Sequence, residues 1–237
     1  MFTLVFQHPD FLVIDKHPGI SVHKDDNEQP LLAEVARHTG DEKLYLIHRL
    51  DKMTSGLLLL GRHHEAASLL SANFAQRVVE KYYLAIGTKK PKKKQGIVVG
   101  DMTRSRRSSW KLETSRENPA ITQFFSTTGG DGRRLFLCKP HTGKTHQIRV
   151  ALRSVGSGIT GDDIYGCEAA DRGYLHAYAL RFPYLGEQWQ FVCPPTRGEL
   201  WQGDAVKAGL AEWQTPWMLN WPAVPGKSKQ GQTDAEK

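Results

Sequence analysis

The chain has 237 residues, 39% of them hydrophobic and 24% charged, a composition that suits a folded domain and excludes a disordered or membrane-embedded chain. No apolar run approaches the length of a bilayer span, and the first residues show no signal peptide pattern. The net charge of +7 favours a polyanionic partner, of which nucleic acid is the commonest. Three scattered cysteines, Cys138, Cys167 and Cys193, indicate reduced thiols and a cytoplasmic location.

The first third of the chain predicts a hairpin, a helix and two buried strands. The β-rich or apolar runs that predict the strands are Phe2–Gln7, Phe11–Lys16, Leu44–Ile47 and Leu57–Leu60. A helix begins at Pro30 and ends before Gly40, and its apolar face is formed by Leu31, Leu32, Val35 and Ala36. The charged segment "HRLDKMTSG" lies between the last two strands, so we expect its carboxylate, Asp51, to be half-buried.

The remainder of the chain predicts more strands than helices. A second helix covers Glu65–Gln76, with an apolar stripe of Ala66, Leu69, Leu70 and Phe74. The expected strands are Lys81–Gly87, Ala120–Ser126, Arg134–Pro140, Tyr174–Phe182 and Glu187–Cys193. Because strands and helices do not alternate regularly, we expect an α+β fold with a central mixed, largely antiparallel sheet and flanking helices.

A basic insertion runs from about Thr88 to Pro119 between two expected strands. Concentrated like charges repel one another and resist burial, so we expect this region to be exposed and mobile. It is either a solvated loop or an arm that grips phosphates, and we favour the arm because the excess charge is concentrated here. The candidate phosphate contacts within it are Lys92, Lys93, Lys94, Arg104, Arg106 and Arg107.

The segment "KPHTGKTHQIRVAL" predicts a strand that leads into a helix. Thr145 can cap this helix, which runs to about Val155 and ends at Gly156. At helical spacing, an inner apolar face is formed by Ile148, Leu152 and Val155. A basic ridge on another face is formed by His146, Arg149 and Arg153, and we add His146 and Arg153 to the candidate phosphate contacts.

Several other chemistries lack the residues that they need. Ser55 has no identifiable base partner, and no GxSxG motif is present. Asp162 and Asp163 are adjacent and would point apart in an extended chain, so a turn explains them better than a carboxylate pair. No set of His, Cys and Asp has convincing metal spacing, and we expect no metal.

Asp51 is the strongest candidate for chemistry. A loop aspartate is usually a cap or turn residue. A half-buried carboxylate, however, needs a cationic partner, and the chain offers Arg49 nearby and Arg149 on the helix. An arginine beside Asp51 would keep it ionised, and an ionised, desolvated carboxylate is a competent nucleophile or general base.

A set of motifs occurs in one order along the chain: "VIDKHPGISVH", "HRLDKMTSG", "KYYLA", "HTGKTHQIRVAL", "GDDIYG" and "LHAYALRF". In this order they resemble the KPxGxxVH, HRLDxxTSG, KxYxA, TGRTHQIRVHL, GDxxYG and LHAxxLxF elements of the RluA-type pseudouridine synthases, over about Leu4 to Pro195. The first motif differs by the inserted His17. Lys144 and Ala151 stand where the family often has Arg and His.

The resemblance implies the pseudouridine synthase catalytic fold, with a catalytic cleft across the sheet. It further implies one catalytic domain over residues 1–224, without an N-terminal RNA-binding domain of the S4 type, and we expect a disordered polar tail over 225–237.

The resemblance also implies a catalytic role for three residues. Asp51 would be essential, Arg149 would fix and ionise it, and Tyr83 would stack on the target base. Arg49 would fill the space left by the flipped base or hold its phosphate. Further substrate-binding candidates are His48, Thr54, Leu57 and Ile148, although ordinary core packing explains Leu57 and Ile148 equally well.

The implied activity is isomerisation of a specific uridine in structured RNA, either ribosomal or transfer RNA, without cofactor or metal. We expect a cytoplasmic monomer with no membrane contact. The alternative is an RNA-binding or RNA-folding protein on the same scaffold without turnover, which the presence of Asp51, Tyr83 and Arg149 argues against. A glycosidase-like hydrolase would need a second facing carboxylate, and none matches Asp51.

Overall fold

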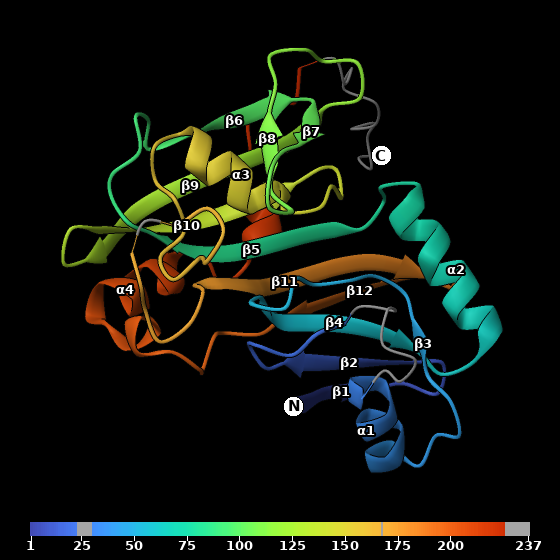
Figure 1. Cartoon of the computed structure of the whole chain (residues 1–237). Helices are drawn as coiled ribbons and strands as arrows, with labels where there is room; N and C mark the ends of the chain where they lie inside the picture. Colours follow the sequence, from blue (N-terminus) through green and yellow to red (C-terminus); the bar gives the residue numbers. More distant parts are fainter. Residues whose placement is uncertain (23–29, 167, 226–237) are drawn as a thin grey trace, which may run out of the picture.

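The computed structural model describes residues 1–22, 30–166 and 168–225, and its main element is a ten-stranded sheet (Figure 1). Its strands are β1 (Phe2–Gln7), β2 (Phe11–Lys16), β3 (Tyr45–Leu46), β4 (Ser55–Gly61), β5 (Glu80–Gly87), β6 (Gln95–Gly100), β9 (Ala120–Gly130), β10 (Arg133–Pro140), β11 (Leu175–Tyr184) and β12 (Glu187–Val192). The order is β1-β2-β4-β11-β5-β10-β9-β6, with β3 paired to β4 and β12 to β11. Only the β4–β11 pair is parallel among the described strands, which confirms the expected mixed, largely antiparallel sheet.

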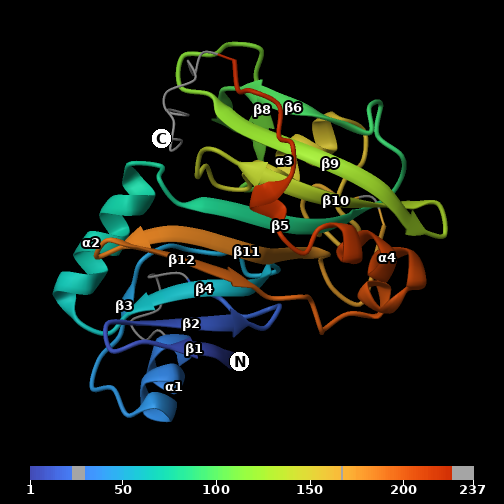
Figure 2. The ribbon, with the colours of Figure 1, turned by 180° about the vertical axis from the view of Figure 1, so that it is seen from behind.

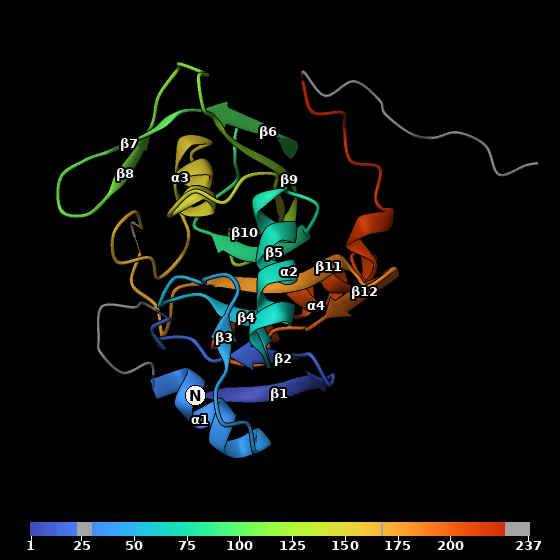
Figure 3. The same ribbon diagram turned by 90° about the vertical axis from the view of Figure 1, so that its right-hand side faces the viewer.

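Helices lie on both sides of this sheet. They are α1 (Pro30–Thr39), α2 (His64–Ala75), α3 (Gln147–Ser154) and α4 (Asp204–Glu212), with short 3₁₀ helices η1 (Glu199–Gln202) and η2 (Pro216–Met218). Figure 3 shows α1 and α3 on one side and α4 with β12 on the other, and Figure 2 shows the α4 side. The strands β7 (Met102–Arg104) and β8 (Trp110–Leu112) form a separate hairpin beside α3. No helix among the described residues is long and apolar enough to cross a membrane.

The four leucines of β4 show why the sequence forms a buried central strand. Leu58 and Leu60 pack with Val35 of α1 on one face of the sheet, whereas Leu57 and Leu59 pack with Leu70 of α2 on the other. Since both faces are covered, the strand is apolar throughout rather than alternating. Leu57 therefore belongs to the core, and its assignment to a substrate pocket is wrong.

The structure corrects two further expectations about the elements. Leu69 does not belong to the buried stripe of α2, because it is 50% exposed, while Ala66, Ala67 and Leu70 are buried. The basic insertion is not a loop throughout: it contains β6, which forms the edge of the sheet against β9, and the β7–β8 hairpin. Of the tail expected over 225–237, only Pro225 lies within the described residues. Cys167 also lies outside them, and the two described cysteines, Cys138 and Cys193, are free thiols.

Candidate active site

Asp51 lies in the loop 47–54, which connects β3 to β4 at the centre of the sheet. The Thr54 N–H donates to the Asp51 carbonyl at 2.9 Å, which closes a turn, and the Asp51 side chain is 26% exposed. Lys16, which is wholly buried, donates from Nζ to the carbonyl of Lys52 at 3.3 Å, and the Gly19 N–H donates to the same carbonyl at 2.8 Å. The carboxylate thus sits on a loop that is fixed from both sides.

The start of α3 is set by Gln147 and not, as expected, by a Thr145 cap. The Gln147 Oε1 accepts from the Thr142 hydroxyl at 2.7 Å and from the Lys144 N–H at 3.0 Å, while its Nε2 donates to Thr122 at 2.9 Å. His146 occupies the N-cap position in the left-handed region, with φ 58°, and makes no side-chain cap. These bonds tie the helix to β9, so the next turn of α3 faces the Asp51 loop.

Arg149 joins the helix to Asp51. Its Nη1 donates to Asp51 Oδ2 at 3.2 Å, while Nε and Nη2 donate to the two oxygens of Asp162 at 2.8 and 2.7 Å. The side chain of Arg149 is 4% exposed and that of Asp162 is 0% exposed, so the predicted basic ridge is wrong for Arg149. Burial opposes the charges of both groups, but their hydrogen bonds and mutual attraction outweigh it, which raises the pKa of Arg149 and lowers that of Asp162.

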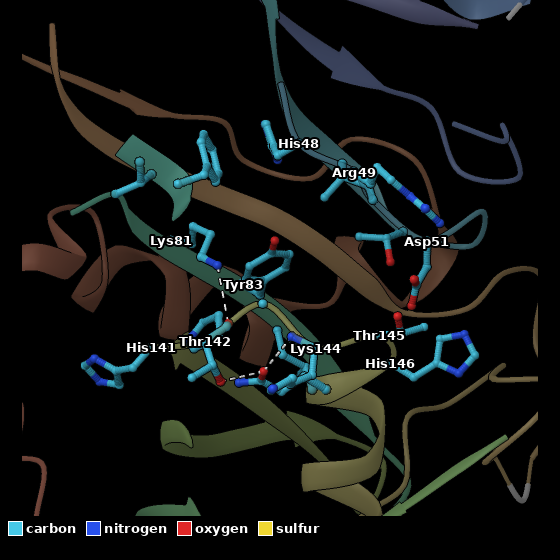
Figure 4. A pocket seen from close by; sticks show the side chains of 18 of the residues that line it. His48, Arg49, Asp51, Lys81, Tyr83, His141, Thr142, Lys144, Thr145 and His146 are labelled. Atoms are coloured by element: carbon cyan, nitrogen blue, oxygen red, sulfur yellow. Dashed lines mark hydrogen bonds between the residues drawn. The ribbon is translucent and has the colours of Figure 1, made fainter. Parts of the chain in front are cut away.

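Tyr83 lies on β5 and faces the same pocket as Asp51 (Figure 4). Burial, and secondly the charge of Asp51, raise the pKa of Tyr83 well above its usual value. The phenol is therefore neutral at physiological pH, where it can stack on a base and donate one hydrogen bond.

These groups line a pocket of about 660 Å³, a volume typical of small-molecule sites. Among the residues that the sequence singled out, the pocket is lined by His48, Arg49, Asp51, Thr54, Tyr83, His146, Ile148 and Arg149. Segments that are 98 residues apart in the chain, at Asp51 and Arg149, thus meet across the middle of the sheet.

His48 has a structural contact that limits its role. Its Nε2 accepts the Leu59 N–H at 2.9 Å, and its ring stacks on Phe74 with 4.4 Å between centroids. Burial, with a smaller contribution from the charge of Lys81, lowers the pKa of His48 to about 3. The imidazole is therefore neutral and serves as part of the pocket wall.

The candidate phosphate contacts are distributed over two places. Lys92, Lys93, Lys94, Arg104, Arg106 and Arg107 are exposed on the insertion, and Arg104 lies over the Trp110 ring at 5.9 Å. His146 and Arg153 instead contact Tyr165: His146 Nδ1 lies 2.8 Å from its hydroxyl, and Arg153 Nη1 donates to its carbonyl at 3.0 Å.

Sequence reasoning missed the roles of Asp162 and Tyr165. The turn expected at Asp162 exists, since Asp162 Oδ1 accepts the N–H groups of Ile164 and Tyr165, but the same carboxylate also holds Arg149. The Tyr165 hydroxyl accepts the Trp110 N–H at 2.7 Å, and its ring lies under the Arg149 guanidinium at 5.2 Å. The motif "GDDIYG" was the available signal, because it pairs a buried acid with an aromatic ring.

The expectation that Ser55 lacks a base partner is wrong, although the pair does not form a reactive site. The Ser55 hydroxyl lies 2.7 Å from Nδ1 of His176, and Arg172 donates to Ser55 Oγ at 2.8 Å. Both Ser55 and His176 are almost completely buried, and burial lowers the pKa of His176 to about 3. The pair connects β4 to β11. Among the described residues, no cluster of His, Cys, Asp or Glu is arranged to hold a metal ion.

Comparisons with known proteins show the family to which the chain is related. The sequence profile described as RNA pseudouridylate synthase matches residues 10–154, a span that contains Asp51, Tyr83 and Arg149. A Haemophilus influenzae protein named "Uncharacterized RNA pseudouridine synthase" is 49% identical over 200 residues, covering 84% of this chain and 89% of that protein. Ribosomal large subunit pseudouridine synthase C of Vibrio parahaemolyticus is 27% identical over 219 residues, covering 87% and 69%. Human RNA Pseudouridylate Synthase Domain Containing 1 has a TM-score of 0.70 at 27% identity, covering 82% of this chain and 84% of that one.

The fold and these relatives define an isomerase that acts on RNA. The chain belongs to the RNA pseudouridylate synthase family, as its RluA-type motifs predicted.

Proposed function

We propose that the chain converts a specific uridine of structured RNA into pseudouridine, and that Asp51 is the essential residue. The observation that carries the proposal is the contact between the Asp51 carboxylate and Arg149, whose other nitrogens are bound by buried Asp162. Moving a charged side chain that is already paired and buried costs free energy, so Arg149 holds Asp51 in one place.

The reaction breaks the bond between N1 and C1′ of uridine, turns the base and joins C5 to C1′; C5 loses a proton and N1 gains one. Asp51 has three possible routes: addition to the base, attack on C1′, or removal of a ribose proton. Each route needs an ionised carboxylate that is shielded from bulk water. Tyr83 stacks on the base and, as a neutral phenol, can assist the proton transfer at C5.

The substrate must leave its base stack to reach Asp51. Arg49, which is exposed at the edge of the pocket beside Asp51 (Figure 4), occupies the vacated space or holds the phosphate.

Ribosomal RNA is the first substrate to test, because relatives are named ribosomal large subunit pseudouridine synthases C and D, and transfer RNA is the second. The basic insertion supplies further phosphate contacts through Lys92, Lys93 and Lys94.

The test of Asp51 measures tritium release from C5-tritiated ribosomal and transfer RNA transcripts. Wild-type protein should release tritium, and Asp51→Asn should release none above background, because an amide is neither a base nor a good nucleophile. Asp131→Asn, in the exposed turn between β9 and β10, is the control and should behave as wild type. Release by Asp51→Asn at the wild-type rate would remove Asp51 from the mechanism, whereas wild-type binding without any release would favour the RNA-binding alternative.

The role of the insertion is tested by binding. Replacing Lys92, Lys93 and Lys94 with Ala should weaken RNA binding and flatten its dependence on salt, since each lost phosphate contact releases one fewer counterion. Lys207→Ala, on the exposed side of α4, is the control. A triple variant with the wild-type salt slope contradicts a phosphate-binding role for the insertion.

A further inference from the structure

Two cations meet at the end of the pocket that lies away from Asp51. Lys81 precedes Tyr83 by two residues on β5, so both side chains point to the same face of the strand, about 7 Å apart. In Figure 4 the Tyr83 ring lies between Lys81 and Asp51. Arg77, which follows α2, lines the same pocket and is close enough for its charge to disfavour the protonated form of Lys81.

Neither cation has an acidic partner in the part of the chain that the structure describes. Within the described residues, no carboxylate oxygen lies within 4.0 Å of the side-chain nitrogens of Lys81 or Arg77. Lys81 Nζ makes one long hydrogen bond, 3.4 Å, to the Thr142 carbonyl. The neighbouring acid Glu80 is on the opposite face of β5, where it pairs with other cations. Two like charges that face one cavity without a counterion favour the binding of an anion between them.

Arg77 occupies a backbone position at the end of α2 that usually holds glycine. Arg77 follows the C-cap of α2 with φ 59°, and the N–H groups of Arg77 and Val78 donate to Phe74 and Asn73, which is a Schellman motif. Glycine is favoured there because the Cβ of any other residue is crowded in the left-handed region. Arg77 occupies this position nevertheless, and its side chain lines the pocket.

A second hollow continues from this end of the pocket. It has a volume of about 450 Å³ and shares Arg77, Val79, Pro140 and His141 with the pocket. It extends to Lys139 and Arg181, which bind Glu80 at 3.4 Å each. A polyanionic strand that leaves the pocket past Lys81 and Arg77 would therefore enter a second hollow, which is lined by Lys139, Arg181 and the Glu80 carboxylate that pairs with both.

We propose that Lys81 and Arg77 bind one phosphodiester of the RNA, next to the nucleotide in the pocket, and that the strand leaves along the hollow toward Lys139 and Arg181. This inference rests on the proposed function, because it takes RNA as the ligand. An ammonium and a guanidinium on one phosphate make charge-assisted hydrogen bonds and remove the repulsion between the two cations. Such a contact fixes the register of the strand without reading its sequence, whereas Asp51 and Tyr83 act on the base.

The test measures the affinity of full-length protein for two probes, a large-subunit ribosomal RNA transcript and a mixed-sequence single-stranded 20-mer, between 50 and 300 mM KCl. All variants carry Asp51→Asn, so that no turnover occurs. Lys81→Met, Arg77→Gln and the double variant are compared with Lys207→Met. We expect each single change to lower the affinity about tenfold at the low-salt end and to reduce the slope of log K against log[KCl] by about 0.7–0.9. The double variant should reduce the slope little further, because both residues share one phosphate.

Two results would overturn the proposal. A weaker affinity with an unchanged slope would mean that Lys81 contacts an uncharged part of the RNA, and slopes that fall additively would mean two separate phosphates. Lys81→Arg keeps the charge and should restore the slope, which a structural role for the amine would not explain. Because the measurement needs no catalysis, a wild-type protein that releases no tritium would refute the proposed isomerisation and leave this result standing.

Discussion

Replacing Asp162 with Asn tests whether the buried ion pair holds Arg149 in place. The Asp162 side chain is 0% exposed, and its oxygens accept from Arg149 at 2.8 and 2.7 Å and from two backbone N–H groups at 2.9 and 3.0 Å. Asparagine has the same size, but it turns one acceptor into a donor that faces the guanidinium. Arg149 then keeps Asp51 and the exposed Asp163 as its remaining anions.

The expected loss of stability follows from burial. Removing one partner of a buried ion pair costs about 3–5 kcal/mol, and because Asn retains one acceptor we expect the lower end, about 3 kcal/mol. The adjacent Asp163 provides a matched control: its side chain is 86% exposed and its contact with Arg149 is 3.5 Å, so Asp163→Asn should cost less than about 1 kcal/mol.

The assay is urea unfolding of both variants, with tritium release measured in parallel. Asp162→Asn should also release tritium more slowly than wild type, because Arg149 loses its fixed orientation toward Asp51. Acid unfolding gives a second measurement. The pKa of Asp162 in the folded protein is lowered below its usual value of 3.8. The contribution of Asp162 to folding stability is therefore complete above pH 3.8 and is lost as the pH falls through the pKa of the folded state. If Asp162→Asn is as stable as Asp163→Asn, the account of a rigidly held arginine is refuted.

Three further changes test the site and its frame. Gly56→Ala should prevent folding or destabilise the protein severely, because φ is +110° and the new Cβ would lie 2.2 Å from the Ala177 carbonyl; soluble expression and a cooperative melt would contradict this. Tyr165→Phe should cost about 1–2 kcal/mol and speed hydrogen exchange of the Trp110 amide, which loses its acceptor; equal exchange rates would show that the hairpin is held otherwise. RNA affinity should fall between pH 7 and 9.5, because burial and Arg77 lower the pKa of Lys81 to about 8 and the neutral amine no longer binds phosphate; Lys81→Arg should abolish this step.

The apolar pattern predicted the strands and helices well, because each reflects a local rule. The continuous leucines of β4 indicated a strand covered on both faces, and Pro30 and Gly40 marked the ends of α1. The order of the strands was not predictable in the same way. The segment from Leu175 to Tyr184 forms β11, which lies between β4 and β5 in the sheet. Its pairing with β4 joins residues that are about 120 positions apart in the chain.

The basic insertion shows how one strong local signal hid another. The charges at 92–94 and 104–107 predicted exposure correctly, since these side chains are exposed. Between them, however, Ile97, Val98 and Val99 form a short β-branched run, and Val98 is buried in the core against β9. The charged runs on either side concealed this three-residue strand signal.

Arg149 contacts Asp51, as the resemblance implied, but it is buried and does not lie on the exposed basic ridge that helical spacing predicted. Two carboxylates that it binds, those of Asp51 and Asp162, differ in how exposed they are. Helical spacing put Arg149 on a face with His146 and Arg153, and that face lies against the "GDDIYG" turn. Asp162 binds two of the guanidinium's nitrogens and is fully buried, so it is fixed by its partners and closed to substrate. Asp51 accepts one longer bond from the remaining nitrogen and keeps part of its surface open to the pocket. One arginine therefore binds a carboxylate that is closed to the pocket and a second carboxylate that stays partly exposed to it.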